Sequence, residues 1–290
     1  MASTVASVLN ENGVHRIAPT LPGWGETSPP IQSQSFHECL FHDVTAIVDH
    51  FHPGWRLPGS PKLRLYLVGL AYGSVAAQIL YGASYEQFPL GRHIAGLLLV
   101  SPTSPPHIHD DFSRCLTWDD YFTLGPISHI FPFNFHHRLT GYFIRERVKT
   151  PNHAAQLVQE SQRNRLSDEQ RNAVKQYWQS HGATLEEAQQ RVGDMMSRSV
   201  QTSIEGYNMM PKVINSDWGG YDPRIADRDR NIPVLVVVTD TDKEHRLMGE
   251  WLVKTLEKAT GRFVDTKSAF PYEDILRQFW DMCHQPKKES

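Results

Sequence analysis

The stretch GLAYG, residues 69–73, follows an apolar run and precedes an amphipathic segment, as a tight turn between a strand and a helix would. In a G-x-S-x-G turn of this kind, the middle serine is exposed on a sharp bend and acts as a nucleophile. Position 71 is alanine, so this turn has no reactive oxygen. The backbone N–H of Tyr72 does not depend on that side chain. We expect this N–H to remain available to a carbonyl or carboxylate group.

Acidic residues follow a second apolar run, IPVLVVVTDTD, at Asp240 and Asp242. An acid at a strand end can orient a catalytic histidine, or it can cap the helix that follows. The segment VDTKSAFPYED, residues 264–274, contains no histidine that would serve as the base. Capping is therefore the favoured role for Asp242, because a carboxylate at a helix N-terminus interacts well with the helix dipole.

The segment HIHDD places His107, His109, Asp110 and Asp111 at a spacing that metal ligands also use. No further motif of histidine or acidic residues completes a coordination shell, and neutral imidazole at this spacing is weak evidence by itself. We interpret this segment as a polar loop by which the chain leaves the sheet. The sequence predicts no metal and no cofactor.

The composition is that of a soluble globular protein. The 290 residues are 40% apolar and 21% charged, with a formal net charge of −3 and no basic stripe that would indicate nucleic acid. The longest apolar runs are too short to span a bilayer, so no membrane association is expected. The N-terminus lacks the pattern of a signal peptide, and the three scattered cysteines favour reduced thiols. We expect a cytoplasmic protein.

Apolar runs that alternate with amphipathic helices predict an α/β fold with a mostly parallel sheet. We expect helices at 4–13, 35–51, 249–260 and 272–283, and strands at 14–19, 62–70, 94–102, 232–242 and 261–266. The strand runs are continuously apolar, as in strands that are covered on both faces. The helix at 35–51 places Phe36, Leu40, Val44, Ile47, Val48 and Phe51 on one face.

Residues 105–230 change in character, since strand-like runs disappear. An insertion of this length is too long for a loop, so the core comprises 1–104 and 231–290 and a helical cap spans 105–230. Capping boxes start helices at Ser167 and Thr184. An aromatic run that includes Trp118 and Tyr121 either lines a ligand pocket under this cap or packs the cap on the core. We interpret Trp218 as an anchor where the cap returns to the core, and we count it with Trp118 and Tyr121 among the candidate substrate-binding residues.

Three segments together resemble the α/β-hydrolase superfamily, in particular fungal members with a long helical cap. They are VHRIAPTLPGWGETSP (14–29), LVGLAYGS (67–74) and PVLVVVTDTD (233–242). The resemblance places Ala71 at the position of the nucleophile and Asp242 at that of the acid. It places Ala269 or Asp265 at the position of the histidine, and His284 lies too far along the chain. Both the nucleophile and the base of a Ser-His-Asp triad are thus substituted.

The resemblance also implies that the family's first three strands precede the helix at 4–13 and have no match here. In the family, the third of them lies between the strands expected at 14–19 and 62–70. Unpaired strand edges in a sheet interior are rarely tolerated. Three explanations stay open: a segment upstream of Met1, closure of the two flanking strands onto each other, or another chain in the gap.

The sequence favours a protein of this fold that does not hydrolyse by the serine route. The expected partner is a small hydrophobic molecule under the cap, either bound or transformed without covalent catalysis, as in the isomerisation or cyclisation of a secondary metabolite. One alternative is a serine-type hydrolase whose nucleophile is substituted here. Another is a ligand sensor or a truncated paralogue. The oligomeric state stays open, a dimer included.

Overall fold

The computed structural model describes residues 7–31, 33–57, 62–125, 135–226, 232–239, 243–264 and 271–284. In these residues, four parallel strands form one sheet in the order β1-β2-β3-β4. The strands are β1 (Leu65–Leu70), β2 (Ile94–Val100), β3 (Val234–Thr239) and β4 (Ala259–Val264). The α/β class with a parallel sheet is confirmed.

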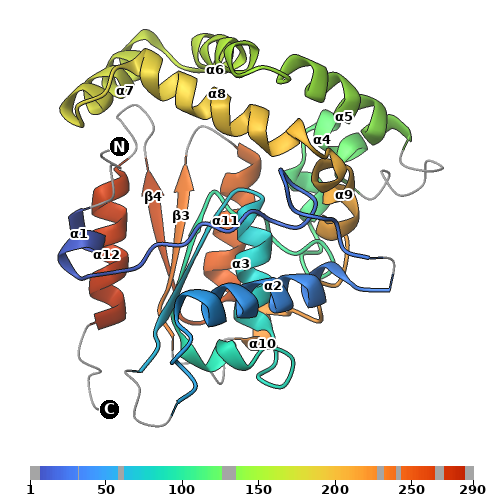
Figure 1. The fold of residues 1–290 in the computed structure, drawn as a ribbon, viewed down its shortest axis with the longest axis vertical. Coiled ribbons are helices and arrows are strands. Elements are labelled where there is room, and N and C mark those ends of the chain that lie inside the picture. The colour runs from blue at the N-terminus through green and yellow to red at the C-terminus, as the bar shows by residue number, and fades with distance from the viewer. Residues whose placement is uncertain are drawn as a thin grey trace.

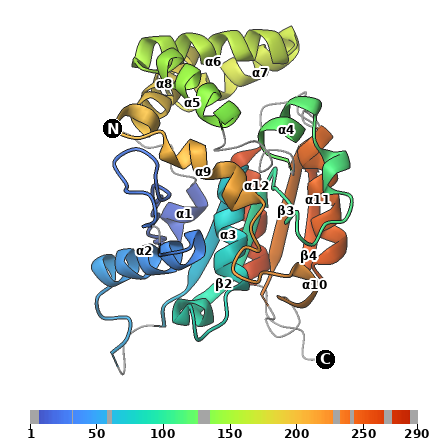
Figure 2. The ribbon, with the colours of Figure 1, turned by 90° about the vertical axis from the view of Figure 1, so that its right-hand side faces the viewer.

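Helices connect and cover the strands (Figures 1 and 2). The core helices are α1 (Ser7–Glu11), α2 (Phe36–Phe51), α3 (Gly73–Gly82), α11 (Lys243–Thr255) and α12 (Tyr272–His284). Between β2 and β3, the described chain is helical: α4 (Trp118–Thr123), α5 (Phe135–Arg147), α6 (Pro151–Arg165), α7 (Asp168–Ser180), α8 (Leu185–Gln201), α9 (Glu205–Ile214) and α10 (Pro223–Ala226). Short 3-10 helices span Pro89–His93 and Phe112–Cys115. Figure 1 shows α6, α7 and α8 above the carboxyl ends of β3 and β4.

Alternating residues of the central strands bury two apolar layers. On one face, β2 and β3 contribute Leu97, Leu99, Val234, Val236 and Val238 to a core shared with α2, α3 and α11. On the other face, they contribute Leu98, Val100, Leu235 and Val237 to a core shared with α1 and α12. Because side chains alternate between the faces of a strand, the continuous apolar runs of β2 and β3 are what a sheet covered on both sides requires.

Strand β1 departs from the prediction that it is covered on both faces. It lies at the edge of the sheet, where the side chains of Val68 and Leu70 are 52% and 64% exposed. Residues 14–19, predicted to be a strand, form no strand in the structure. A strand needs a neighbour to satisfy its backbone groups, and no described segment pairs with residues 14–19. Among the described residues, closure of the two flanking segments onto each other is therefore contradicted.

Local signals at the helix ends are confirmed. The predicted capping boxes start α7 at Ser167 and α8 at Thr184, and a third box joins Ser35 to Glu38 at the start of α2. Only part of the predicted apolar face of α2 is buried: Leu40 and Val48 are, whereas Phe51 at the helix end is 51% exposed.

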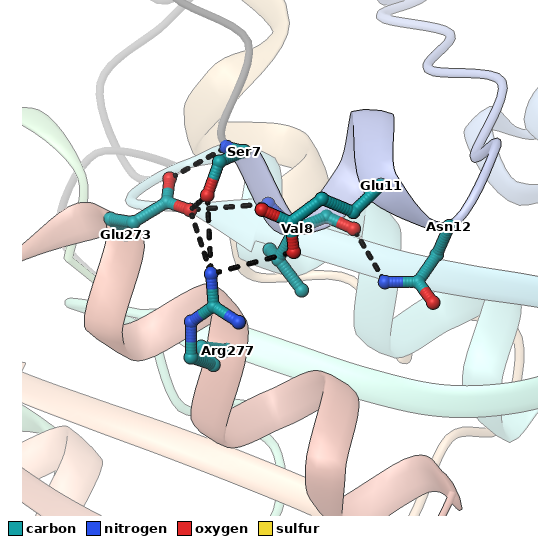
Figure 3. Close-up of polar contacts among 6 residues, drawn as sticks. All are labelled: Ser7, Val8, Glu11, Asn12, Glu273 and Arg277. Atoms are coloured by element: carbon teal, nitrogen blue, oxygen red, sulfur yellow. Dashed lines mark hydrogen bonds and ion pairs between the residues drawn. The ribbon is translucent and has the colours of Figure 1, made fainter.

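Helix α1 is held on α12 by a polar cluster (Figure 3). The carboxylate of Glu273 accepts hydrogen bonds from the backbone N–H groups of Ser7 (3.0 Å) and Val8 (3.1 Å) and from the Ser7 hydroxyl. Arg277 pairs with Glu273 and with Glu11 of α1. The negative charge lies at the N-terminus of α1, where unpaired N–H groups and the helix dipole favour it.

We expect α1 to detach from α12 in acid. Partial burial tends to raise the pKa of Glu273, but hydrogen bonds from Ser7 and Val8 and the charge of Arg277 outweigh it and lower the pKa below its ordinary value of 4.5. A lowered pKa means that the carboxylate stabilises the folded state fully above pH 4.5, and that this stabilisation is lost as the pH falls through the lowered pKa. The protection factors of the α1 amides, which are their hydrogen-exchange rates divided into the rates of an unfolded chain at the same pH, measure this effect. Glu273→Gln should remove the loss of protection in acid, and a protection factor that still falls with pH in this variant would contradict the prediction.

No helix among the described residues is long and apolar enough to cross a membrane.

Candidate functional site at the strand-to-helix turn

The turn that follows β1 keeps a strained backbone although it carries no nucleophile. Ala71 has φ = 46°, a left-handed conformation that is uncommon for a residue with a side chain. Its N–H donates to the carbonyl of Val100 on β2 (3.0 Å), and its carbonyl accepts from the N–H of Ser74 in α3 (2.9 Å). The chain thus reverses directly from β1 into α3, as in the elbow that presents a nucleophile. The side chain that this turn presents is the methyl group of Ala71.

The two glycines of the turn meet different surroundings. A Cβ on Gly69 would lie 2.6 Å from the Cα of Ser74 and 2.9 Å from the Cβ of Ala77, so α3 packs directly on the strand at this point. A Cβ on Gly73 would meet no atom within 4 Å. Close packing therefore requires a glycine at position 69 and does not require one at position 73.

We expect Gly69→Ala to lower the stability of the protein and Gly73→Ala not to lower it. The first forces α3 away from β1, and overpacking of this kind costs about 1–3 kcal/mol. The second replaces a helical glycine where space is open, which leaves stability unchanged or raises it by up to about 1 kcal/mol. Urea unfolding of the two variants measures both effects. Equal losses in the two variants would show that the backbone, and not packing, requires these glycines.

Tyr72 lies between the core and an apolar cluster on the carboxyl side of the sheet. Its ring packs against the α2–α3 core and against Phe112, Ile214 and Met248, which come from three separate segments. Burial raises the pKa of its phenol, so this group is neutral at physiological pH. The N–H of Tyr72 makes no hydrogen bond within the described part of the chain. That it donates to a carbonyl or carboxylate of a ligand stays a prediction.

The loop with the sequence PGWG joins the turn to the inserted helices. Its Trp24 lies 6.5 Å from Tyr72, measured between ring centroids. The carbonyl of Gly23 accepts from the N–H of Gly206 in α9 (2.7 Å), and a Cβ on Gly206 would lie 2.3 Å from the Trp24 ring. The loop and α9 are thus packed without space between them. Trp24 was not among the predicted site residues, because its contacts lie far along the chain.

Ser101 is a second strained residue at the carboxyl ends of the strands, and the sequence analysis did not identify it. It follows β2 directly, as Ala71 follows β1, and it has φ = 45°. Its hydroxyl lies 3.1 Å from that of Thr239 at the end of β3. Strained residues gather at functional sites. The only sequence signal is its position one residue after an apolar strand.

A buried serine–histidine pair lies where the chain leaves β2. The hydroxyl of Ser104 is 2.7 Å from Nδ1 of His109, whose ring stacks on Trp251 of α11 at 4.4 Å between centroids. Burial lowers the pKa of His109 although Asp111 and Asp110 oppose this shift. Ser104 has no exposed surface, so a substrate cannot reach its hydroxyl. This pair anchors the loop and does not replace a catalytic serine and histidine.

The remaining residues of the HIHDD segment give no sign of a metal centre. Nε2 of His107 lies 3.0 Å from the backbone carbonyl of Tyr221, and Asp111 pairs with Arg114. In the ranges that the structure describes, no three histidine, cysteine or acidic side chains lie close enough together to hold a metal ion.

The predicted aromatic residues occupy two separate places. The rings of Trp118 and Tyr121 in α4 contact each other edge to face, with their centroids 6.2 Å apart. Trp118 is 80% exposed, which argues against a position in the wall of an enclosed pocket. Trp218 is fully buried and stacks on Tyr221 at 6.1 Å, beside His107. Its role as an anchor between the inserted helices and the core stays a prediction.

The other predicted site residues lie outside the described residues. These are Asp240 and Asp242 after β3, and Asp265 and Ala269 after β4. Histidine His284 is described, and it contacts Tyr66 at the start of β1 (3.1 Å). Since Ala71 follows the other end of this strand, about 16 Å away, His284 is not placed to act at the turn.

A groove of about 500 Å³ lies between α5 and α6, apart from the turn. Its lining mixes apolar and charged side chains from these two helices: Phe143, Glu146, Arg147, His153, Gln156, Leu157 and Glu160.

Comparison with known proteins agrees with this architecture. The model of the alpha/beta hydrolase family matches residues 2–273. A bromoperoxidase from Bacillus anthracis is similar in structure with a TM-score of 0.52 and 14% identity, over 90% of this chain and 79% of that one. MenH from S. aureus has a TM-score of 0.49 and 11% identity, over 91% and 82% of the two chains. No curated protein sequence matches the chain. At these identities, the structural likeness concerns the fold alone.

Proposed function

The chain belongs to the alpha/beta hydrolase family, and we propose that this protein acts on a small hydrophobic molecule without covalent catalysis. The alanine at the position of the family's nucleophile argues against the serine route. The observation that carries this proposal is Ala71 at φ = 46°. The turn keeps the strained conformation that presents a nucleophile, and it presents a methyl group. The segment from 264 to 274 also supplies no histidine, so a base of the usual kind is absent as well.

The groups that remain at the turn favour a ligand with a carbonyl or carboxylate on an apolar body. The N–H of Tyr72 supplies a hydrogen-bond donor at the start of α3, where the helix dipole also favours a partial negative charge. Phe112, Ile214 and Met248 belong to a buried apolar cluster against which Tyr72 packs. An apolar site with one or two placed polar groups is the usual form of a small-molecule site.

We further propose that residues 105–230 act as a cap over this site, as the family resemblance implies. A cap that excludes water would strengthen the hydrogen bond from Tyr72 and hold a flexible ligand in one conformation. Orientation alone lowers the barrier of an intramolecular reaction by several kcal/mol. Isomerisation or cyclisation of a secondary metabolite is the reaction class that such a site suits best.

The proposal is tested by ligand binding followed over time. Small esters, lactones and carboxylic acids with apolar bodies are screened by thermal shift, and each hit is incubated and followed by mass spectrometry. We expect a saturable rise in melting temperature, since a ligand at 100 times its Kd stabilises a protein by about 2.7 kcal/mol. We expect no hydrolysis product. Rapid ester cleavage by the unmodified protein would overturn the proposal.

A pair of variants isolates the backbone donor. Tyr72 has φ = −56°, which proline also adopts, and its N–H holds no partner in the described chain. Tyr72→Ala keeps the N–H, whereas Tyr72→Pro removes it. We expect Tyr72→Pro to bind a carbonyl ligand about tenfold more weakly than Tyr72→Ala, because a hydrogen bond to a polar ligand contributes about 1.4 kcal/mol. Circular dichroism checks that both variants fold. Equal affinities would remove this donor from the site.

A ligand sensor is the alternative without turnover, and the same incubation separates it from an enzyme. Both predict saturable binding, but only an enzyme changes the mass or the chromatographic behaviour of its ligand. An isomer has the mass of its substrate, so chromatography decides this case.

A further inference from the structure

Two histidines that lie 37 residues apart in the chain meet at the carboxyl end of α2. Nδ1 of His15 is 3.2 Å from Nε2 of His52, and the centroids of the two rings are 5.2 Å apart. His15 is exposed and His52 is half-buried, so ions in the surrounding water can reach both rings. The sequence analysis did not identify this pair, because metal-ligand motifs are recognised by short spacings and these two residues are far apart in the chain.

The separation of the two nitrogens is that of two ligands of one tetrahedral metal ion. Bonds of about 2.0–2.1 Å from zinc to imidazole nitrogen, at the tetrahedral angle, put two bound nitrogens about 3.3–3.4 Å apart. When both lone pairs point at the metal, the ring centroids lie about 5.2 Å apart. The two distances in the structure, 3.2 Å and 5.2 Å, are close to these values. Little movement of either ring is therefore needed for a metal ion to replace the hydrogen that lies between them.

The surroundings of the pair favour a cation and orient one of the rings. His52 is the C-cap of α2, a helix of 16 residues. The carboxyl end of a helix carries a partial negative charge, which attracts a positive ion. The ring of Phe51 contacts the His15 ring edge to face, with the centroids 5.3 Å apart. This contact gives a role to Phe51, whose side chain is otherwise exposed at the end of the helix.

We propose that His15 and His52 bind one zinc ion, with water molecules as its other ligands. Zinc is bound well by imidazole nitrogen, and it also accepts water as a ligand in a tetrahedral site. Among the residues that the structure describes, no third histidine, cysteine or acidic side chain joins this pair. The affinity is therefore lower than that of a structural zinc site with four protein ligands.

A zinc ion at this place joins two segments that the strand ladders leave unconnected. His15 belongs to residues 14–19, which form no strand and lead into the PGWG loop. His52 ends α2, which shares an apolar core with α3. Because the two ligands are brought together only by folding, zinc binding stabilises the folded state. The pair shares no residue with the turn at Ala71, so this proposal does not depend on the proposed function.

Calorimetric titration of the metal-free full chain with zinc chloride at neutral pH tests the site. We expect one ion per chain and a saturable rise in melting temperature. His15→Ala and His52→Ala should each weaken this binding at least about tenfold, since even the loss of a partner outside the ligands lowers metal affinity about 10–100-fold. His42→Ala is the matched control, because His42 is an exposed histidine of the same helix, and it should leave zinc binding unchanged. Absence of binding, or binding that both His15→Ala and His52→Ala retain, would overturn the proposal.

Chemical modification of the unmodified protein locates the ligands if either variant does not fold. Diethyl pyrocarbonate reacts with accessible imidazole nitrogens, and mass spectrometry of the peptides gives the rate at each histidine. Zinc should slow the reaction several-fold at His15 and His52 and leave the rate at His42 unchanged. Equal rates at His15 and His52 with and without zinc would show that the ion binds elsewhere, and the proposal would be wrong.

Discussion

Ala71→Ser is expected to leave the protein without ester hydrolysis and without labelling by a serine-reactive phosphonate. The strained turn accepts a serine, because position 71 already holds a side chain at φ = 46°. The new hydroxyl would have no base, however. Without a base to remove its proton, a serine is a poor nucleophile. In an intact triad, loss of the histidine alone lowers kcat by about 10⁶-fold, so any residual rate would be close to background.

Two histidines of the described chain, His109 and His284, have other partners, which supports this expectation. Nδ1 of His109 contacts Ser104, and its ring is stacked on Trp251. His284 contacts Tyr66 at the far end of β1. Neither is placed to take a proton at the turn.

A double variant supplies the control. Resemblance to the family places the missing base near Ala269, so A71S/A269H carries both lost groups. We expect phosphonate labelling of the double variant and none of A71S alone. Labelling of A71S alone would instead support a hydrolase whose only defect is the substituted nucleophile. Histidine-to-alanine changes would then locate the base that the protein uses.

Trp218→Ala is expected to destabilise the protein more than any other single substitution considered for this chain. The ring is 1% exposed, stacks on Tyr221 and donates a hydrogen bond from Nε1 to the carbonyl of Ile214 (2.9 Å). Truncation of a buried tryptophan costs about 3–5 kcal/mol, because the cavity only partly closes. Urea unfolding followed by circular dichroism measures this loss.

Trp118→Ala is the matched control for this prediction. The Trp118 ring is 80% exposed, so its removal should change stability by less than about 0.5 kcal/mol. Trp218→Phe keeps an aromatic ring and loses the hydrogen bond to Ile214, and we expect an intermediate effect. A small loss in Trp218→Ala would mean that the junction between the inserted helices and the core unfolds separately. It would then not be an anchor.

Much of the architecture follows from local patterns. The apolar runs that became β2 and β3 are buried on both faces because their sequences carry no polar side that water could cover. The boxes at Ser167 and Thr184 start helices because a side chain three residues away satisfies the first N–H groups. Such signals act within one turn of a helix or one strand, so a single sequence is enough to read them.

Segments 14–19 and 62–70 show where local patterns fail. The sequence predicts a strand in each, and only the second contains one, β1, because β2 pairs with it. The first has suitable residues but no neighbour among the described strands. The exposure of Val68 and Leu70 could not be predicted for the same reason. Whether the side chains of a strand are buried depends on the helices and strands that pack against it, which a local pattern does not specify.

The sequence by itself determined that the turn carries alanine at position 71 and which class the fold belongs to, because both depend on residue identity and short-range pattern. Only the tertiary structure decided which groups meet. It brought Ser104 to His109 in a buried pair, joined Ser7 to Glu273 across 266 residues, and left β1 at an edge. These contacts depend on how distant segments pack together. Packing minimises exposed apolar area and unpaired backbone groups over the whole chain, and not within any one segment.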